Sequence, residues 1–407
     1  MTGLRAKDEK KGFLDLGLPS VPSLLPEGIV NSHTISGIGA LSSLGHDVEA
    51  HFKAVSEGRT AIMPLGGLLG NDSPHAALPG AWISPRNLMN NRKWSPSSMA
   101  ALHVAKEAVT MAGWNVSECE NAALIVGTSR GNAAGWLDPW PGRRPFKLMA
   151  ASNTIHSEPA TAVSIELGIL GENHVVASGC SAGLDALGLA KMLLDCGRVE
   201  RALVVAVDLP LVPRLLDNYA ASGLLGSRME LDPFAADSNG FIPGEGAAAI
   251  ALSSGICGKT LLSHFANNSD GADPVGVPED GGRTHLLMEK AIAAFGKPAA
   301  IFPHATGTRI QARAERTIFA EAARDPHTTI HLLKPSVGHT IGASGLLESV
   351  ILLRFLEESR LPPNLRGMTA PSGWRLPEEA IPCSGPVFKL AHGMGGHNAL
   401  AVFQTTP

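Results

Sequence analysis

The feature that most constrains how this chain can fold is an internal duplication of its strands and helices. An apolar run over 122–128 leads into a loop of glycine and threonine, and a second apolar run over 299–302 leads into the loop that contains His304. Apolar runs of this length, followed by turn residues, are typical of buried strands. The repeat therefore predicts two similar α/β halves instead of two unrelated domains.

Two helices and two further strands are predicted at matching places in these halves. One helix follows the small residues of Ser178–Gly183 and ends near Cys196, and the other follows Ile341–Gly345 and ends near Glu358. The additional strands cover 202–207 and 399–403. Strands and helices that alternate in this way form apolar sheets covered on both faces. Two dinucleotide-binding domains are disfavoured, because the glycine-rich turns lack G-x-G-x-x-G after a first strand.

The composition indicates a globular protein in a reducing compartment. The chain has 407 residues, 44% hydrophobic and 17% charged, with a net charge of -4, which allows a large core and argues against nucleic acid as a partner. The longest apolar segments, 202–212 and 346–356, are interrupted by charged residues, so no membrane span is predicted. Five cysteines without a C-x-x-C pair predict neither a metal site nor disulfides and favour a cytoplasmic location. The charged segment 1–30 is interpreted as a solvated N-terminal tail.

The candidate nucleophile is Cys180, which follows a β-branched run and stands at the predicted start of a helix. Unpaired N–H groups and the helix dipole at such a position favour the thiolate over the thiol. A free cysteine is also commonly a buried packing residue, so the position alone leaves both interpretations open. Two further segments, His304–Thr308 and Lys334–His339, favour the nucleophile.

These three segments, in this order, resemble the active-site motifs of the β-ketoacyl synthases, the condensing enzymes of fatty-acid and polyketide assembly. The likeness is to type II ketosynthases of the thiolase superfamily. That family has a cysteine before a helix, a histidine in a His-Gly-Thr-Gly-Thr loop, and a second histidine in a Lys-x-x-x-x-His-x-x-Gly-Ala turn, which here spans Lys334–Ala343. The resemblance begins at Ser36 and extends through Asp232–Phe234, Asn239–Gly246 and Gly393–Asn398.

The resemblance implies the thiolase fold, an α/β fold of duplicated halves in five layers, α-β-α-β-α. It implies an N-terminal half at 31–255, which carries the nucleophile, and a C-terminal half at 256–407, which carries the two histidines. A degradative thiolase would have a nucleophile nearer the N-terminus and a second cysteine in the closing glycine-rich motif. The segment 393–398 contains no cysteine, so that alternative is disfavoured.

The resemblance also implies an acyltransferase that condenses an acyl thioester on Cys180 with malonyl-acyl carrier protein. A thiolate serves this reaction because it is both a good nucleophile and a good leaving group. His304 and His339 would direct N–H groups at the enolate oxygen that forms when the malonyl group loses CO2. Lys334 would hold this pair in its neutral form, with Glu315 as the buried partner of the lysine.

Other residues would bind the substrate, by the same resemblance. Thr306 and Thr308 match the threonines that hydrogen-bond the phosphopantetheine arm of the carrier protein, and His392 belongs to the closing motif beside the pocket. The N–H groups of Cys180 and Met394 would form the oxyanion hole. Met394 replaces the phenylalanine that gates the acyl pocket, and its flexible thioether favours looser control of the acyl chain.

Several residues depart from the family pattern. Ala305 replaces the glycine after the first histidine, and Ala312 replaces an acidic residue. Arg130 stands where housekeeping enzymes have a small or aliphatic pocket residue; it would need an anionic or carbonyl partner there, or else would point to solvent. These departures favour a specialised polyketide or polyene pathway.

The expected partners are an acyl carrier protein, which delivers phosphopantetheine, and a second subunit. No bound cofactor and no metal ion are expected. The second subunit would complete a two-fold dimer, either a copy of this chain or a chain-length-factor homologue. The alternative is that this chain is itself such a factor, which only shapes the pocket; the presence of Cys180 favours an enzyme. Candidate basic residues for carrier-protein docking are Arg143, Arg144, Lys147, Arg214 and Arg228.

Overall fold

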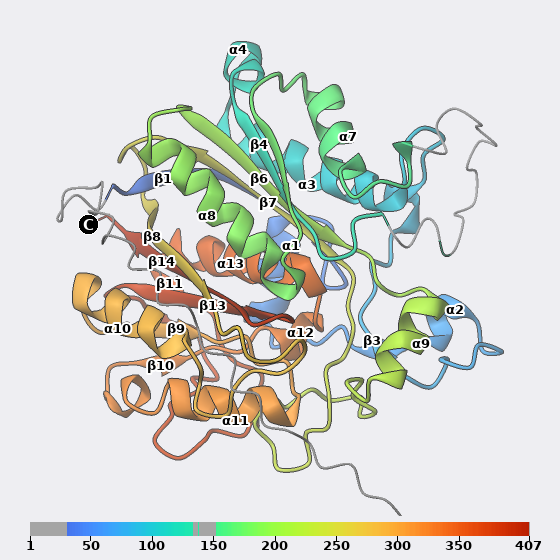
Figure 1. Cartoon of the computed structure of the whole chain (residues 1–407), viewed down its shortest axis with the longest axis vertical. Helices are drawn as coiled ribbons and strands as arrows, with labels where there is room; N and C mark the ends of the chain where they lie inside the picture. Colours follow the sequence, from blue (N-terminus) through green and yellow to red (C-terminus); the bar gives the residue numbers. More distant parts are fainter. Residues whose placement is uncertain (1–30, 133–136, 138–151, 407) are drawn as a thin grey trace, which may run out of the picture. The chain divides into compact units, whose positions relative to one another are not determined.

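The computed structural model describes residues 31–132, 137 and 152–406, and Figure 1 shows how their elements are arranged. Within this part of the chain, one 10-stranded mixed sheet has the order β10-β9-β13-β14-β8-β1-β7-β6-β4-β5. Its first half consists of β1 (His33–Ser42), β4 (Ala123–Gly127), β5 (Asn173–Val176), β6 (Arg201–Asp208) and β7 (Gly246–Ser253). Its second half consists of β8 (Thr260–Ser269), β9 (Ala300–Phe302), β10 (Thr329–Ile330), β13 (Val387–Gly393) and β14 (His397–Thr405).

The two halves of the sheet repeat one topology. Counted outward from the middle, each half has its first strand, then its fifth, fourth, second and third. In both halves the first and fifth strands pair antiparallel, as do the fifth and fourth, whereas the second strand lies parallel to both of its neighbours. The halves meet where β1 pairs antiparallel with β8. The predicted duplication is confirmed.

One detail of the predicted duplication is wrong. The segments 202–207 and 399–403 are both strands, but they do not occupy equivalent places. By position in the sheet, β6 corresponds to β13, and β14 corresponds to β7. The reason is that β13 includes Lys389 and His392, which interrupt its apolar pattern, although both side chains are buried.

Two helices form the middle layer, and they position the site. Helices α8 (Ala182–Asp195) and α13 (Ser344–Leu356) pack on each other and on strands of both halves. Every residue of α13 except Arg354 is buried. The small residues at the starts of these helices are necessary, because a Cβ on Gly183 would lie 2.8 Å from the carbonyl oxygen of Gly342. The two predicted helices are therefore confirmed at the places where the sequence indicated them.

Further helices cover the outer faces of the sheet. The helices α3 (Pro96–Ala112) and α7 (Glu158–Leu167) pack on the first half, and α10 (Thr284–Phe295) and α11 (Arg309–Ile318) contribute to the core that covers the second. Together with α8 and α13 they give the predicted five layers, α-β-α-β-α. All residues of β6 except Arg201 are buried. A strand that is apolar on both faces needs helices on both sides of the sheet.

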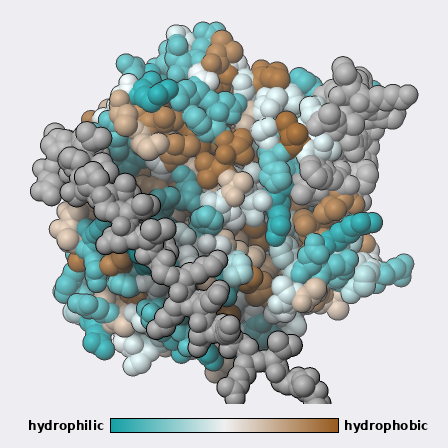
Figure 2. Space-filling view, in the orientation of Figure 1, coloured by the Kyte–Doolittle hydropathy of each residue, from teal (hydrophilic) through white to brown (hydrophobic). Residues whose placement is uncertain are grey.

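The remaining elements are short or lie in loops. They are α1 (Val48–Ser56), α2 (Gly66–Leu69), α4 (Val116–Glu120), α9 (Pro213–Ala221), α12 (Lys334–Val337), β2 (Met63–Pro64), β3 (Pro79–Gly80), β11 (Arg360–Leu361) and β12 (Ile381–Pro382). Short 3-10 turns are η1 (Arg86–Met89), η2 (Gly179–Ser181), η3 (Ala322–Arg324) and η4 (Ile341–Ala343). None of the helices that the structure describes is both long and apolar enough to cross a membrane. Figure 2 shows hydrophobic residues exposed around α8, between hydrophilic regions.

Candidate active site

Cys180 lies in the turn η2, between β5 and the start of α8. Its side chain is buried. Gly179 before it has a φ of +65°, and a Cβ at that position would lie 3.5 Å from the backbone nitrogen of Met394. The turn therefore brings the backbone of the closing glycine-rich segment next to the thiol.

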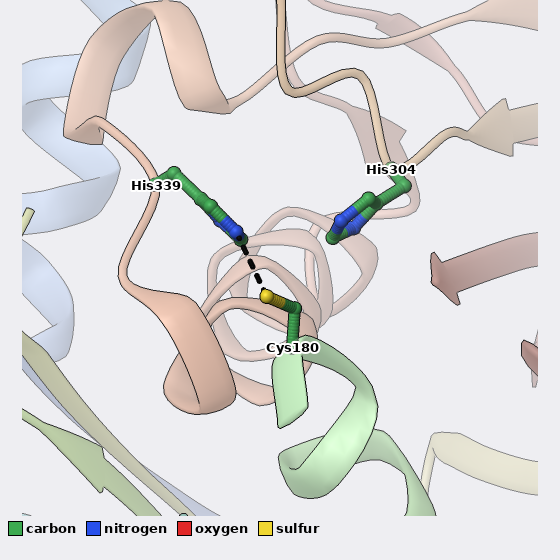
Figure 3. A group of neighbouring side chains, drawn as sticks. All are labelled: Cys180, His304 and His339. Atoms are coloured by element: carbon green, nitrogen blue, oxygen red, sulfur yellow. Dashed lines mark hydrogen bonds between the residues drawn. The ribbon is translucent and has the colours of Figure 1, made fainter. Parts of the chain in front are cut away.

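Two histidines from the second half of the chain point at this thiol (Figure 3). His339 follows α12, and its Nε2 lies 3.2 Å from the Cys180 Sγ. His304 lies between β9 and α11, and its ring centroid is 5.2 Å from that of His339, with the two ring planes at 86°. The structure thus brings together the three residues that the sequence indicated, from segments far apart in the chain.

Burial determines the charge of all three side chains. It raises the pKa of the Cys180 thiol to about 12; the Asp208 carboxylate adds to this rise, while Lys334 and Arg130 oppose it. Burial, followed by the charge of Lys334, lowers the pKa of His339 to about 3 and that of His304 well below its ordinary value. The resting site therefore holds a neutral thiol and neutral imidazoles. The expected thiolate at the helix start is not favoured, because desolvation outweighs the helix N-terminus.

Lys334 is buried, and its ionic partner is Glu348 on α13. The Lys334 Nζ is 2.6 Å from Glu348 Oε1, and Lys389 on β13 lies 2.7 Å from the other carboxylate oxygen. Burial alone would raise the pKa of Glu348, but the two lysines lower it to about 2. One buried carboxylate is thus shared by two lysines.

Glu315 is buried, but it does not pair with Lys334 as the resemblance implied. Its Oε1 accepts the backbone N–H groups of His304 and Ala305, at 2.7 Å and 3.0 Å. The difference arises because Glu315 lies on α11, directly after the His304 loop, whereas Lys334 reaches α13. Burial raises the pKa of Glu315 to about 7. This carboxyl group fixes the backbone that presents His304.

His392 packs against His304 and is held on both sides. Its Nε2 lies 3.1 Å from Thr284 Oγ1, and its Nδ1 lies 2.6 Å from Gln311 Nε2. The centroid of its ring is 5.7 Å from that of His304. Burial, followed by the charges of Lys389 and Lys334, lowers the pKa of His392 to about 3. With both ring nitrogens in hydrogen bonds, His392 shapes the pocket with its ring.

A small cavity opens on the thiol and the histidines. It has a volume of about 70 Å³. Thr306 and Thr308 line it, with their hydroxyl oxygens 3.2 Å apart, and Met394 lines it from the opposite segment. The other lining residues are Cys180, Leu224, Phe241, Val275, Val277, His304, Gln311, His339, Ile341, His392 and Gly393. Ligand pockets usually occupy several hundred Å³, so side chains must move before a substrate enters. A larger cleft, of about 810 Å³, lies elsewhere and contains none of the three reactive side chains.

Arg130 is half-buried and does not line this cavity. Its Nε lies 3.3 Å from the hydroxyl of Tyr219. Tyr219 packs edge-on against Phe241, which packs in turn against His339. Cys180, Tyr219 and Phe241 belong to one apolar cluster, and the Arg130 guanidinium contacts this cluster at Tyr219.

Asp208 is a site residue that the sequence analysis missed. It lies at the end of β6, fully buried, and accepts the N–H groups of Ser129, Arg130 and Gly342. Burial raises its pKa to about 6. It ties the loop after β4 to the turn after His339. Only its place at the end of an apolar strand could have indicated it.

The expected docking residues are partly outside the described chain. Arg143, Arg144 and Lys147 fall among the residues that the structure does not describe. Arg214 is exposed on α9, and Arg228 forms an ion pair with Asp237.

One group of possible metal ligands occurs in the described part of the chain, and it is Cys180 with His304 and His339. Their donor atoms lie within 4.8 Å of one another. A histidine that binds a metal usually donates its other ring N–H to an acceptor. The Nδ1 atoms of both histidines are buried without any such partner, so this group does not fit a metal site.

Two family models match most of the chain. The model described as "Beta-ketoacyl synthase, N-terminal domain" matches residues 34–255. The model described as "Beta-ketoacyl synthase, C-terminal domain" matches residues 260–367.

The curated relatives include one bacterial and one fungal protein. The chain is 23% identical over 416 residues to "3-oxoacyl-[acyl-carrier-protein] synthase 2" of Staphylococcus aureus, which covers 91% of this chain and 100% of that protein. It is 26% identical over 389 residues to "Highly reducing polyketide synthase sphB" of Aspergillus fumigatus, covering 88% of this chain. The matched region is 15% of that fungal protein.

Solved structures of similar fold include two polyketide systems. A chain from "AntDE:AntF (apo): type II PKS acyl-carrier protein in complex with its ketosynthase bound to the hexaketide" aligns with a TM-score of 0.79 at 21% identity, over 93% of this chain and 100% of that one. A chain from "The ishigamide ketosynthase/chain length factor" gives the same TM-score at 19% identity, with the same coverage. These similarities confirm the predicted thiolase fold.

Proposed function

Because this chain belongs to the β-ketoacyl synthase family of acyltransferases, we propose that it condenses an acyl group on Cys180 with malonyl-acyl carrier protein, with loss of CO2. The observation that carries the proposal is the meeting of Cys180, His304 and His339 in one buried site, with Cys180 Sγ 3.2 Å from His339 Nε2. The product would be a β-ketoacyl-carrier protein of a specialised polyketide, polyene or fatty-acid-like pathway.

The first step transfers the acyl group to Cys180. The Sγ attacks the carbonyl carbon of the acyl thioester, the bond from that carbon to the pantetheine sulfur breaks, and the thiol proton ends on the departing sulfur. The backbone N–H groups of Cys180 and Met394 stabilise the carbonyl oxygen as it becomes negative. Gly393 supports this role, because a Cβ at that position would lie 2.4 Å from the carbonyl oxygen of Ser178 and would keep the two segments apart.

The second step makes the carbon nucleophile. The bond between the malonyl carboxylate and the α carbon breaks, CO2 leaves, and the electron pair forms an enolate on the thioester oxygen. Neutral His304 and His339 donate N–H groups to that oxygen. A buried nitrogen lone pair without a partner is tolerated better than a buried N–H without one, and both Nδ1 atoms lack a partner. The proton of each ring is therefore placed on Nε2.

The third step joins the two substrates. The α carbon attacks the thioester carbonyl on Cys180, and the new carbon–carbon bond forms as the carbon–sulfur bond breaks. Cys180 leaves as a thiolate and takes a proton from solvent, so that the overall reaction consumes one proton. Because burial raises its pKa to about 12, the thiol is restored before the next acyl group arrives.

The remaining predicted residues would bind the substrate in this reaction. Thr306 and Thr308 would hold the phosphopantetheine arm, since their hydroxyls line the cavity that leads to the thiol. His392 would form the pocket wall behind His304. Arg130, with the Tyr219 hydroxyl, would meet an oxygen atom at the far end of the acyl chain.

The proposed partners follow from the same chemistry. We propose an acyl carrier protein as donor and acceptor, and a dimer with a copy of this chain or with a chain-length-factor homologue. The solved complexes named above contain partners of these kinds. A purely pocket-shaping role for this chain is disfavoured, because Cys180, His304, Lys334 and His339 are all present and buried together.

The test is to follow acyl loading and CO2 release separately. Intact-mass spectrometry after incubation with an acyl donor should show one adduct, which Cys180→Ala abolishes and the control Cys119→Ala retains. His304→Ala and His339→Ala should reduce CO2 release by on the order of 10²-fold or more, because each removes a donor in a dry site, and should affect loading less. An adduct on another cysteine, or equal loss of both half-reactions, would contradict the proposal.

A further inference from the structure

Lys389 is a buried lysine that none of the steps above uses. It lies on β13, and its side chain has 0% exposure. Its Nζ is 2.7 Å from Glu348 Oε2 and donates a hydrogen bond to the carbonyl oxygen of Pro303 at 3.3 Å. A charge is kept in such a place only when it is paired and hydrogen-bonded, since its removal from water is costly.

The contacts of Lys389 connect the two histidine segments. Glu348 shares its carboxylate between Lys389 and Lys334. Lys334 begins α12, the helix that leads to His339, while Pro303 directly precedes His304. A continuous series of side-chain contacts therefore runs from one histidine segment to the other, through a carboxylate on the buried helix α13.

We propose that Lys389 is a positioning residue for the histidine pair, and that it acts by fixing the His304 segment relative to the His339 segment through Glu348. The inference rests on the proposed function, because it assigns Lys389 to the decarboxylation step. Loading of Cys180 does not require a fixed separation of the two imidazoles, whereas donation of two N–H groups to one enolate oxygen does.

The charged groups around Lys389 make this role depend on pH. Glu348 from α13, Lys334 from α12 and Glu315 from α11 all face its ammonium group. Burial lowers the pKa of Lys389 to about 8, against the opposing effect of Glu348. Below that pH the lysine is charged and the contact with Glu348 is an ion pair. Above it the lysine is neutral, so the ion pair with Glu348 weakens to a hydrogen bond between a neutral amine and the carboxylate, and the histidine segments are held less firmly.

The experiment compares CO2 release from malonyl-acyl carrier protein with acyl loading of Cys180, in the full chain between pH 7 and pH 9.5. Lys389→Met should reduce CO2 release at pH 7 by at least about tenfold, less than the loss of a direct donor, and leave loading within about twofold. The unaltered chain should release CO2 more slowly above about pH 8. Lys389→Arg, which stays charged over this range, should not show that decline.

The matched control is Lys191→Met, because Lys191 is also a buried lysine paired with a carboxylate, Asp195, but lies outside the site. It should leave the ratio of CO2 release to loading unchanged. Equal losses of both half-reactions in Lys389→Met, or a flat pH profile of the unaltered chain, would overturn the inference. If Lys389→Met does not fold, the pH dependence of CO2 release by the unaltered chain and by Lys389→Arg tests the role of Lys389 without that variant. Absence of CO2 release from the unaltered chain would instead overturn the proposed function and, with it, this inference.

Discussion

At the scale of single residues, burial sets the chemistry of the site more than local sequence does. A thiol at a helix start is expected to have a lowered pKa, yet Cys180 is enclosed and its pKa rises to about 12. The same enclosure keeps His339 neutral, with a pKa of about 3. Neutral donors match the proposed decarboxylation, because an imidazolium beside the malonyl group would bind its carboxylate and disfavour the loss of CO2.

Met394 gives a prediction about chain length. The cavity beside Cys180, of about 70 Å³, must widen before an acyl chain enters, and Met394 can change rotamer with little displacement of its neighbours. Met394→Phe should therefore narrow the range of acyl donors while leaving the backbone N–H and the rate with short chains nearly unchanged. Initial loading rates over a series of saturated and polyunsaturated donors measure this. An unchanged profile would show that Met394 is not the gate.

The sequence indicates the reactive residues but not all of their partners. Cys180, His304 and His339 stand in recognisable motifs, and the structure brings them together. The carboxylate opposite Lys334 is Glu348, because side chains of distant segments meet only once the sheet and helices are packed. Lys389 was missed for a related reason, since one lysine in an apolar strand normally indicates an exposed position.

At the scale of elements, the loop that carries His304 contains a strained backbone conformation, which hydrogen bonds to a buried side chain stabilise. Ala305 has a φ of 44°, in the left-handed region, which costs an alanine roughly 1–2 kcal/mol. The carboxylate of Glu315 receives the N–H groups of both His304 and Ala305 and holds them there. The family has a glycine at this place, which adopts such a φ without strain.

Replacing that alanine gives a stability prediction. Ala305→Gly should raise the thermal midpoint slightly, because relief of the left-handed strain exceeds the extra entropy of an unfolded glycine, for a net gain of about 0.5–1 kcal/mol. Ala312→Gly, inside α11, is the control and should lower the midpoint, since glycine in a helix costs about 1 kcal/mol relative to alanine. Calorimetry of the three proteins gives the comparison. A shift of both variants in the same direction would refute the strain at Ala305.

The elements themselves were predictable wherever a run of apolar residues stood between turn residues. The strands β4 and β9 and the helices α8 and α13 all coincide with such runs. The strand β13 does not, because two buried polar residues, Lys389 and His392, interrupt it. Their partners are on other elements, so no local pattern could reveal that this segment is a central strand.

At the scale of the whole molecule, the two edges of the sheet differ. The edge strand β10 is partly covered, since Ile330 donates its N–H to the carbonyl of Arg375. On the opposite edge, no residue of β5 is fully buried, and no backbone hydrogen bond from the described residues reaches its outer side. Nearby, Leu170 is 77% exposed and Met192 is 53% exposed. Open apolar edges of this kind favour association with another subunit.

The prediction is a two-fold dimer that covers β5. Sedimentation of the purified chain should give twice the mass of the 42.3 kDa protomer, alone or after mixing with a chain-length-factor homologue. Amide exchange in 173–176 should slow on association, and that in β10, as an internal control, should not change. A monomer under both conditions, or unaltered exchange in β5, would disprove this interface.

The division of each protomer into halves at 255/256 also stays a prediction, which separate expression of the halves would test.

The pairing of β1 with β8 joins, within one chain, the half that supplies the sulfur to the half that supplies both imidazoles. This has a genetic consequence. Two defective copies of the gene, one encoding Cys180→Ala and the other His304→Ala, cannot complement each other in a mixed homodimer, because each subunit still lacks one member of its own site. A site assembled across a subunit boundary would recover part of its activity in the same cross.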